Sequence, residues 1–158
     1  MNGAVYEREL KTLLERSFLV VRAGGSLGVD LVALNRLCSV AIEVKASSKP
    51  VINFTSACSR AQKQALELLD ACQRNGVLLL YAYRLKHASK TDSWRVFKMP
   101  VNSLRGYAKL IATHIPDVAC TPSQNYVMRW ENGMPLHAFL QFFAPIGKVD
   151  SSLDYPRI

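Results

Sequence analysis

Apolar residues follow two different periods along the first half of the chain. Leu10, Leu13 and Leu14 recur at helical spacing, which predicts an amphipathic helix over residues 4–16. Runs of apolar and β-branched residues predict strands, and they lie at residues 18–23, 30–34, 39–47 and 77–85. A second helix is expected over residues 57–74. Its predicted N-cap is Ser56, and its predicted core-facing residues are Ala65, Leu66, Leu68 and Leu69.

Loops and weaker elements complete the pattern. The segments GGSLG at 24–28 and SKPVINFTS at 48–56 are expected to be loops, and Asn75-Gly76 is expected to end the second helix. Beyond them we expect a strand at 94–99, a helix at 102–114 begun by Asn102 or Ser103, and a short strand in YVMRW. The order helix, three strands, helix, two strands predicts an α/β fold with a central mixed β-sheet flanked by helices.

The charge of the chain suggests a polyanionic partner. Its 158 residues, enough for one domain, carry a net charge of +8. Residues 71–116 hold eight basic residues and a single acidic one, Asp92. Nucleic acid is the usual partner of such a stretch, and a solvated basic face is the alternative.

Several classes of protein do not fit the composition. No run of about 18 apolar residues is present, so no membrane span is expected. The polar N-terminus lacks the apolar region of a secretory signal, and we therefore expect a cytosolic or nucleoid-associated protein. The four cysteines form no CxxC pair, so reduced thiols are expected rather than a zinc site.

Charged residues interrupt the most strand-like part of the chain, DLVALNRLCSVAIEVKAS at 30–47. Side chains alternate along a strand, so Glu43 and Lys45 share one face. A turn at 35–38 that pairs Leu34 with Ser39 would bring Asp30 level with Glu43. An isolated Glu43–Lys45 surface ion pair is the simpler alternative.

Two converging carboxylates would suit Mg²⁺, with the carbonyl of Val44 as a further ligand. Lys45 would stabilise negative charge beside them. A metal-activated water is a common nucleophile for phosphodiester hydrolysis.

The spacing Asp30, twelve residues, then Glu43-x-Lys45 resembles the PD-(D/E)xK nuclease superfamily. Within that superfamily, GAVYERELKTLLERSFLVVRAGGSLGVDLVAL followed by AIEVKAS resembles the archaeal-type Holliday junction resolvases. The similarity runs from about Gly3 to Arg84. It implies a restriction-endonuclease-like nuclease core over residues 1–100. Residues 101–158 would then be a C-terminal extension packed on that core within a single domain.

The resemblance also implies roles for individual residues. Asp30 and Glu43 match the metal-binding acids, Lys45 the catalytic lysine, and Glu7 an acid near a second metal position. Arg8 and Arg22 match basic residues for DNA binding, and Ser26 matches a serine that assists at the site. The proline of the motif is replaced by Val29, as is common in such resolvases, and Ser17 stands where a glycine is usual. Read from its helix alone, Glu7 would pair with Lys11.

The function implied is a Mg²⁺-dependent endonuclease, with Mn²⁺ as a substitute metal, that cuts four-way junction DNA by paired nicks as a homodimer. A nuclease of the same fold acting on flaps, forks or duplex DNA is the alternative. A non-catalytic DNA-binding protein is disfavoured because both acids and the lysine are present. Residues 71–116 would face the junction arms. No nucleotide-binding motif is found, so no nucleotide cofactor is expected. The setting would be the cytoplasm of an archaeal or virus-infected cell, and a role for Gln62 or Gln64 is left open.

Overall fold

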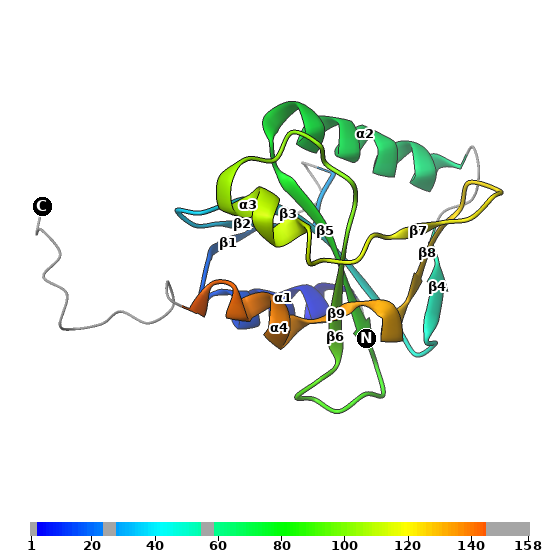
Figure 1. Cartoon of the computed structure of the whole chain (residues 1–158). Helices are drawn as coiled ribbons and strands as arrows, with labels where there is room; N and C mark the ends of the chain where they lie inside the picture. Colours follow the sequence, from blue (N-terminus) through cyan, green and yellow to red (C-terminus); the bar gives the residue numbers. More distant parts are fainter. Residues whose placement is uncertain (1–2, 24–27, 55–58, 145–158) are drawn as a thin grey trace, which may run out of the picture.

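A six-stranded mixed sheet organises the fold (Figure 1). The computed structural model describes residues 3–23, 28–54 and 59–144. The strands lie in the order β1 (Leu19–Arg22), β2 (Leu31–Leu34), β3 (Ser39–Ser47), β5 (Leu78–Leu85), β6 (Trp94–Lys98) and β9 (Met134–Pro135). β3 and β5 are parallel, whereas the other neighbours pair antiparallel. The predicted α/β class with a mixed sheet is therefore confirmed.

The first two predicted helices, α1 and α2, cover opposite faces of this sheet (Figure 1). α1 (Gly3–Leu14) buries Tyr6, Leu10 and Leu14, which recur every four residues, while Leu13 is 38% exposed. α2 (Arg60–Asn75) is the crossover that joins β3 to the parallel strand β5, a connection that requires a helix-length segment.

The ends of α2 show why its predicted start was wrong. Ser59, not Ser56, is the N-cap, because its hydroxyl accepts the Gln62 N–H; Ser56 lies outside the described residues. Gly76 ends the helix as predicted, in the left-handed conformation at φ 64°. Leu66 is 46% exposed rather than core-facing, whereas Leu68 and Leu69 pack against the core.

A second, three-stranded sheet was not predicted. It has the order β4 (Val51–Asn53), β8 (Tyr126–Arg129) and β7 (Ala119–Cys120). The predicted loop 48–56 thus contains a strand, whose partner β8 lies far along the chain. Local turn residues suggested a loop, and the distant pairing overrides that preference.

The remaining helical elements are short: α3 (Gly106–Ala112), η1 (Trp130–Asn132) and α4 (Leu136–Gln141). α3 begins after Arg105, later than predicted, because Asn102 and Ser103 are used elsewhere. The Asn102 N–H and the Ser103 hydroxyl both donate to Gln73 of α2 and so tie the two helices together.

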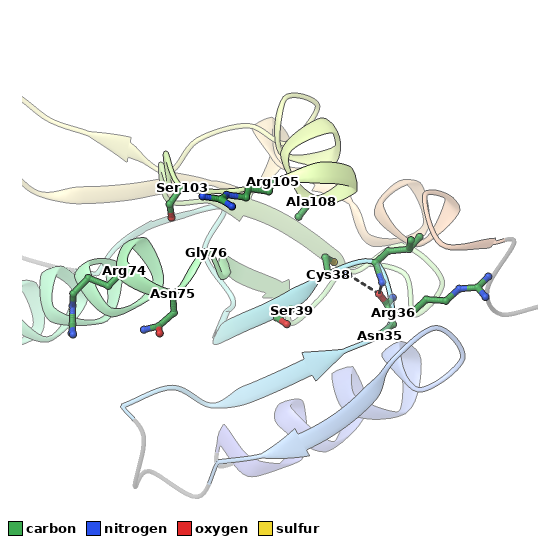
Figure 2. A pocket seen from close by; sticks show the side chains of 11 residues that line it. Asn35, Arg36, Cys38, Ser39, Arg74, Asn75, Gly76, Ser103, Arg105 and Ala108 are labelled. Atoms are coloured by element: carbon green, nitrogen blue, oxygen red, sulfur yellow. Dashed lines mark hydrogen bonds between the residues drawn. The ribbon is translucent and has the colours of Figure 1, made fainter. Parts of the chain in front are cut away.

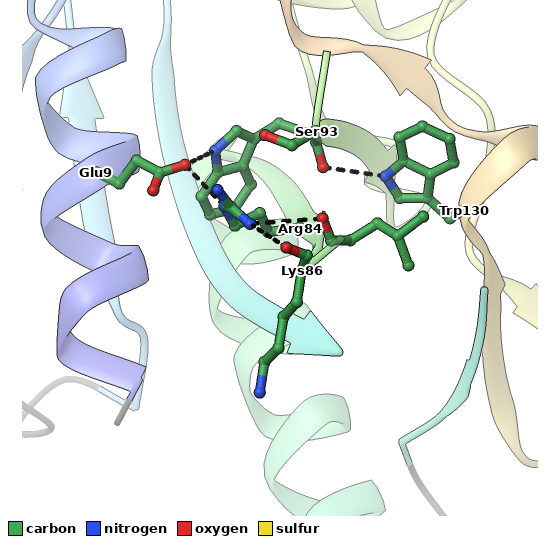
Figure 3. A network of polar contacts seen from close by, with 7 residues as sticks. Glu9, Arg84, Lys86, Ser93 and Trp130 are labelled. Atoms are coloured by element: carbon green, nitrogen blue, oxygen red, sulfur yellow. Dashed lines mark hydrogen bonds and ion pairs between the residues drawn. The ribbon is translucent and has the colours of Figure 1, made fainter. Parts of the chain in front are cut away.

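A polar network joins α1 to the sheet (Figure 3). One carboxylate oxygen of Glu9 accepts hydrogen bonds from Arg84 Nε and Trp94 Nε1, both at 2.8 Å. Arg84 is only 9% exposed, so its charge depends on this partner. The network fixes the helix that carries Glu7 against strands β5 and β6. Among the described helices, none has the length and apolar character needed to cross a bilayer.

Candidate active site

The pairing of β2 with β3 places Asp30 beside Glu43. Leu34 pairs with Ser39 and Leu31 with Ile42, so the residue before Leu31 falls level with the residue after Ile42. This is the predicted register. Both acids border the same cavity, together with Gln64 and Leu68 of α2.

A backbone hydrogen bond fixes the Asp30 carboxylate. Its Oδ2 accepts the N–H of Val44 at 2.7 Å. The ladder between the two strands ends at Leu31 and Ile42, so the Asp30 side chain binds the first backbone donor beyond the paired region. Asp30 is thereby held against the strand that carries Glu43 and Lys45.

The two acids share a partly buried environment that disfavours their charge. Burial is the main cause that raises the pKa of Asp30, and the Val44 hydrogen bond opposes it. Burial, followed by repulsion from Asp30, raises the pKa of Glu43 to about 7. Lys45 opposes this shift without cancelling it. A cation between the carboxylates would remove the repulsion, so the donor set fits a hard divalent metal ion.

Lys45 lies among aromatic side chains that the sequence did not indicate. Its Nζ is 5.6 Å from the centroid of the Phe54 ring, which in turn packs on Tyr81 at 5.0 Å. These residues line a small cavity with Glu43 and Gln64. Phe54 directly follows β4, so the unpredicted strand positions it. The β-prone letters VINF inside the predicted loop were the available signal.

α1 brings Glu7 toward the two acids. Glu7 Oε2 is 3.0 Å from Arg22 Nη2 of β1, whereas Lys11 pairs with Glu15. The expected alternative, a Glu7–Lys11 pair, is therefore wrong. The charge of Glu7 contributes to the raised pKa of Asp30 and of Glu43, which places it within electrostatic reach of both.

The other predicted residues are less closely joined to the acids. Arg8 is exposed on α1, and Ser26 lies outside the described residues. Gln64 lines both cavities that Glu43 borders, whereas the buried Gln62 donates its amide to the Gln124 carbonyl. Within residues 3–23, 28–54 and 59–144, no three His, Cys, Asp or Glu side chains are close enough to hold a metal together. The site offers an acid pair, with Glu7 farther away.

The basic stretch 71–116 is not a single DNA-facing surface as expected. Arg84 and Arg95 are each 9% exposed, and they form ion pairs with Glu9 and Asp92. Lys98 is paired with Asp117. These three of the eight basic residues are thus engaged in ion pairs within the fold, because a buried arginine needs a local partner.

A mixed sheet with helices on both faces, with Asp30 directly before β2 and a Glu-x-Lys on the adjacent strand β3, is the arrangement of the restriction-endonuclease-like fold. The family model described as archaeal Holliday junction resolvase (Hjc) matches residues 1–109, well over half of the chain. The chain therefore belongs to the archaeal Holliday junction resolvase family, as the sequence resemblance predicted.

Two relatives agree with this assignment. A crossover junction endodeoxyribonuclease Hjc of Methanocaldococcus jannaschii is 50% identical over 48 residues, which span 30% of this chain and 36% of the relative. The matched segment is thus about a third of that protein's length. The structure of Hjc of Archaeoglobus fulgidus, a Holliday junction resolvase, is similar with a TM-score of 0.59 at 21% identity. That likeness covers 87% of this chain and 98% of the other, and it supports the fold.

Proposed function

We propose that this protein is a structure-selective endodeoxyribonuclease that resolves four-way junction DNA by symmetric paired nicks. The observation that carries the proposal is the convergence of Asp30 and Glu43 beside Lys45 in a chain of the resolvase family. Nucleases of this family are metal-dependent. The metal ion proposed here is Mg²⁺, with Mn²⁺ as a substitute.

Asp30, Glu43 and the carbonyl of Val44 would hold the metal. The N–H of Val44 points toward Asp30, and the N–H and C=O of one strand residue face the same edge, so the carbonyl faces the acids too. A bound divalent ion would supply a water of lowered pKa and neutralise charge on the scissile phosphate. Lys45, held near the Phe54 ring, would stabilise the charge that develops on that phosphate.

The remaining predicted residues would act around this centre. Glu7 would support a second metal position or orient the attacking water, and its pair with Arg22 would keep that arginine beside the site. Arg22 and the exposed Arg8 would contact the DNA backbone. Ser26 is proposed to assist the reaction.

A homodimer would match the two-fold symmetry of a four-way junction, with one site for each cut strand. The edge strand β1 offers a surface for such an association. Leu19 and Val21 are 68% and 49% exposed there, and side chains two residues apart share one face of a strand. A second copy would bury these apolar groups.

We also propose that residues 1–100 form the nuclease core and that 101–158 are an extension packed on it. A contact of Phe143 supports the packing of the extension on the core, since its ring centroid is 4.7 Å from that of Phe18. The proposed substrate forms on genomic DNA, so the proposed setting is the cytoplasm of an archaeal or virus-infected cell.

The test is a nicking assay with purified protein and Mg²⁺. End-labelled four-way junction, flap and plain duplex of related sequence would be compared at equal concentration. Paired symmetric nicks confined to the junction are expected. Equal cutting of all three substrates would instead identify a general nuclease, and binding without cutting in Mg²⁺ or Mn²⁺ would contradict the enzymatic proposal.

A further inference from the structure

A basic groove lies at the C-terminal end of α2, which carries Arg74 and Asn75 (Figure 2). Its walls are the turn between β2 and β3, the last turn of α2 and the start of α3. The polar or charged residues that line it are Asn35, Arg36, Ser39, Arg74, Asn75, Ser103 and Arg105. None of the lining residues is acidic. The groove therefore presents three arginines without a carboxylate among them.

Two of these arginines are available to a ligand. Arg36 and Arg105 are exposed, and neither forms an ion pair with another residue in the described part of the chain. Arg74 pairs with Asp70 at 3.0 Å, but both side chains are more than 60% exposed, at 68% and 67%. Such an exposed pair is weak and can exchange for a phosphate. This contrasts with Arg84 and Arg95, which the fold has buried.

The groove and the acid pair lie along one line on the same face of the sheet. Ser39 lies at the groove and Glu43 at the acids, and their even spacing puts both side chains on one face of β3. Four residues of strand separate them, roughly 13 Å.

α2 gives an independent measure of the same separation. Gln64, Glu67, Ala71 and Arg74 follow at helical spacing, and they pass from the acid-lined cavity into the groove. Ten residues of helix from Gln64 to Arg74 correspond to roughly 15 Å. Strand and helix thus agree on the distance.

We propose that this groove binds the phosphate backbone of a DNA duplex arm whose axis runs from the acid pair to the groove. The contact would lie about four base pairs from the cut phosphate, because one base pair advances about 3.4 Å along the duplex axis. The proposal rests on the proposed nuclease function, since the acid pair defines the cut position. Arg36 and Arg105 would donate to phosphate oxygens, which arginine binds well through paired N–H groups. Such contacts fix the position of the arm without reading its sequence. Glu67 lines the cavity that contains Asp30 and Glu43, so the surface without acidic side chains lies beyond it, at the groove.

The test uses a short plain duplex and no divalent metal, so that binding is separated from cleavage and from junction selectivity. The double variant Arg36→Ala/Arg105→Ala would be compared with Lys90→Ala/Arg129→Ala, which removes the same charge from exposed positions on other elements. Affinity would be measured by fluorescence anisotropy over a range of salt, with melting curves to establish that both variants are folded.

The groove variant should bind duplex on the order of tenfold more weakly, and its salt dependence should fall by about two phosphate contacts. The matched control should retain most of both. Equal losses in the two variants, unchanged binding by the groove variant, or no duplex binding by the wild type would each overturn the proposal. Whether the wild type cuts junctions is read in the separate nicking assay, so a failure of the proposed function is distinguished from a failure of the groove.

Discussion

The Asp30 carboxylate accepts the backbone N–H of Val44 at 2.7 Å, so one acid is bonded to the strand that carries the other. The contact aligns the two acids across the strand pair. It also separates two properties of Asp30, since the hydrogen bond needs only an acceptor oxygen whereas metal binding needs the negative charge.

Asp30→Asn should therefore preserve the fold and abolish cleavage. The asparagine oxygen can still accept the Val44 N–H, but one of the two charged ligands proposed for the metal is lost. We expect the cleavage rate with Mg²⁺ to fall by about 100-fold or more while junction affinity changes little. A time course on labelled junction, with affinity measured without metal, tests both. Glu131→Gln, an exposed acid on η1, is the control, and cleavage by Asp30→Asn at the wild-type rate would refute the site assignment.

Glu43 should make the metal-free protein less stable as the pH rises. Its pKa of about 7 in the folded state exceeds the ordinary value of 4.5, so the folded protein binds this proton more tightly than the unfolded chain. The resulting stability is fully present below about pH 4.5 and is lost as the pH rises through about 7. Asp30, whose pKa is also raised, acts in the same direction.

Chemical denaturation at several pH values measures this effect. The free energy of unfolding attributable to Glu43 should fall by on the order of 2 kcal/mol across that range. Glu43→Gln should remove most of the fall and be more stable than wild type above pH 7, and we expect it to lose cleavage. Mg²⁺ should stabilise the wild type more at high pH than at low pH. A Glu43→Gln variant with the full wild-type pH dependence would mean that another group is responsible.

Arg22→Ala should weaken both DNA binding and cleavage. Arg22 forms an ion pair with Glu7, whose charge acts on the acid pair. Removing Arg22 leaves the negative charge of Glu7 without this cationic partner. The salt dependence of DNA affinity should fall by the equivalent of about one phosphate contact. The cleavage rate at saturating protein should also be lower than that of the wild type. Arg22→Lys should recover binding more than cleavage, because lysine keeps the charge but not the planar guanidinium. Wild-type cleavage by Arg22→Ala would show that the pair is only structural.

Local sequence patterns were enough to predict the part of the site that depends on strand register. Alternation along residues 39–47 and a short turn determined that Asp30 meets Glu43, and the structure has that pairing. The family resemblance added Glu7 and Arg22, whose ion pair joins α1 to β1. No local period links a helix residue to a strand fifteen positions later, so that contact could not be derived from spacing.

Long-range pairing accounts for what the sequence did not show. β4 finds its partner in β8, which places Phe54 next to Lys45. The charge of residues 71–116 was read as one surface, but packing divided it between internal ion pairs and exposed side chains. Both outcomes depend on tertiary contacts, which override local preference.

Phe54→Leu should slow cleavage without weakening junction binding. The ring lies 5.6 Å from Lys45 Nζ, a distance at which an aromatic face attracts a cation, and leucine provides bulk without that attraction. We expect the rate at saturating protein to fall several-fold, roughly what a loss of about 1 kcal/mol implies. Phe54→Tyr should restore the rate, since its ring face is similar. Equal rates for the leucine and tyrosine variants would show that Phe54 only fills space.

Glu9→Ala should destabilise the whole protein more than any other single truncation on the polar face of α1. It removes the acceptor of both Arg84 and Trp94 and leaves Arg84, a residue that is 9% exposed, without its carboxylate partner. Breaking such a buried pair costs up to several kcal/mol, and because Glu9 itself is partly exposed we expect about 2–3 kcal/mol. Glu15→Ala, which breaks the exposed pair with Lys11, should cost no more than about 0.5 kcal/mol. Denaturant unfolding of the two variants decides the comparison: equal costs would mean that water, rather than Glu9, satisfies Arg84, and that α1 is anchored by Tyr6, Leu10 and Leu14 alone.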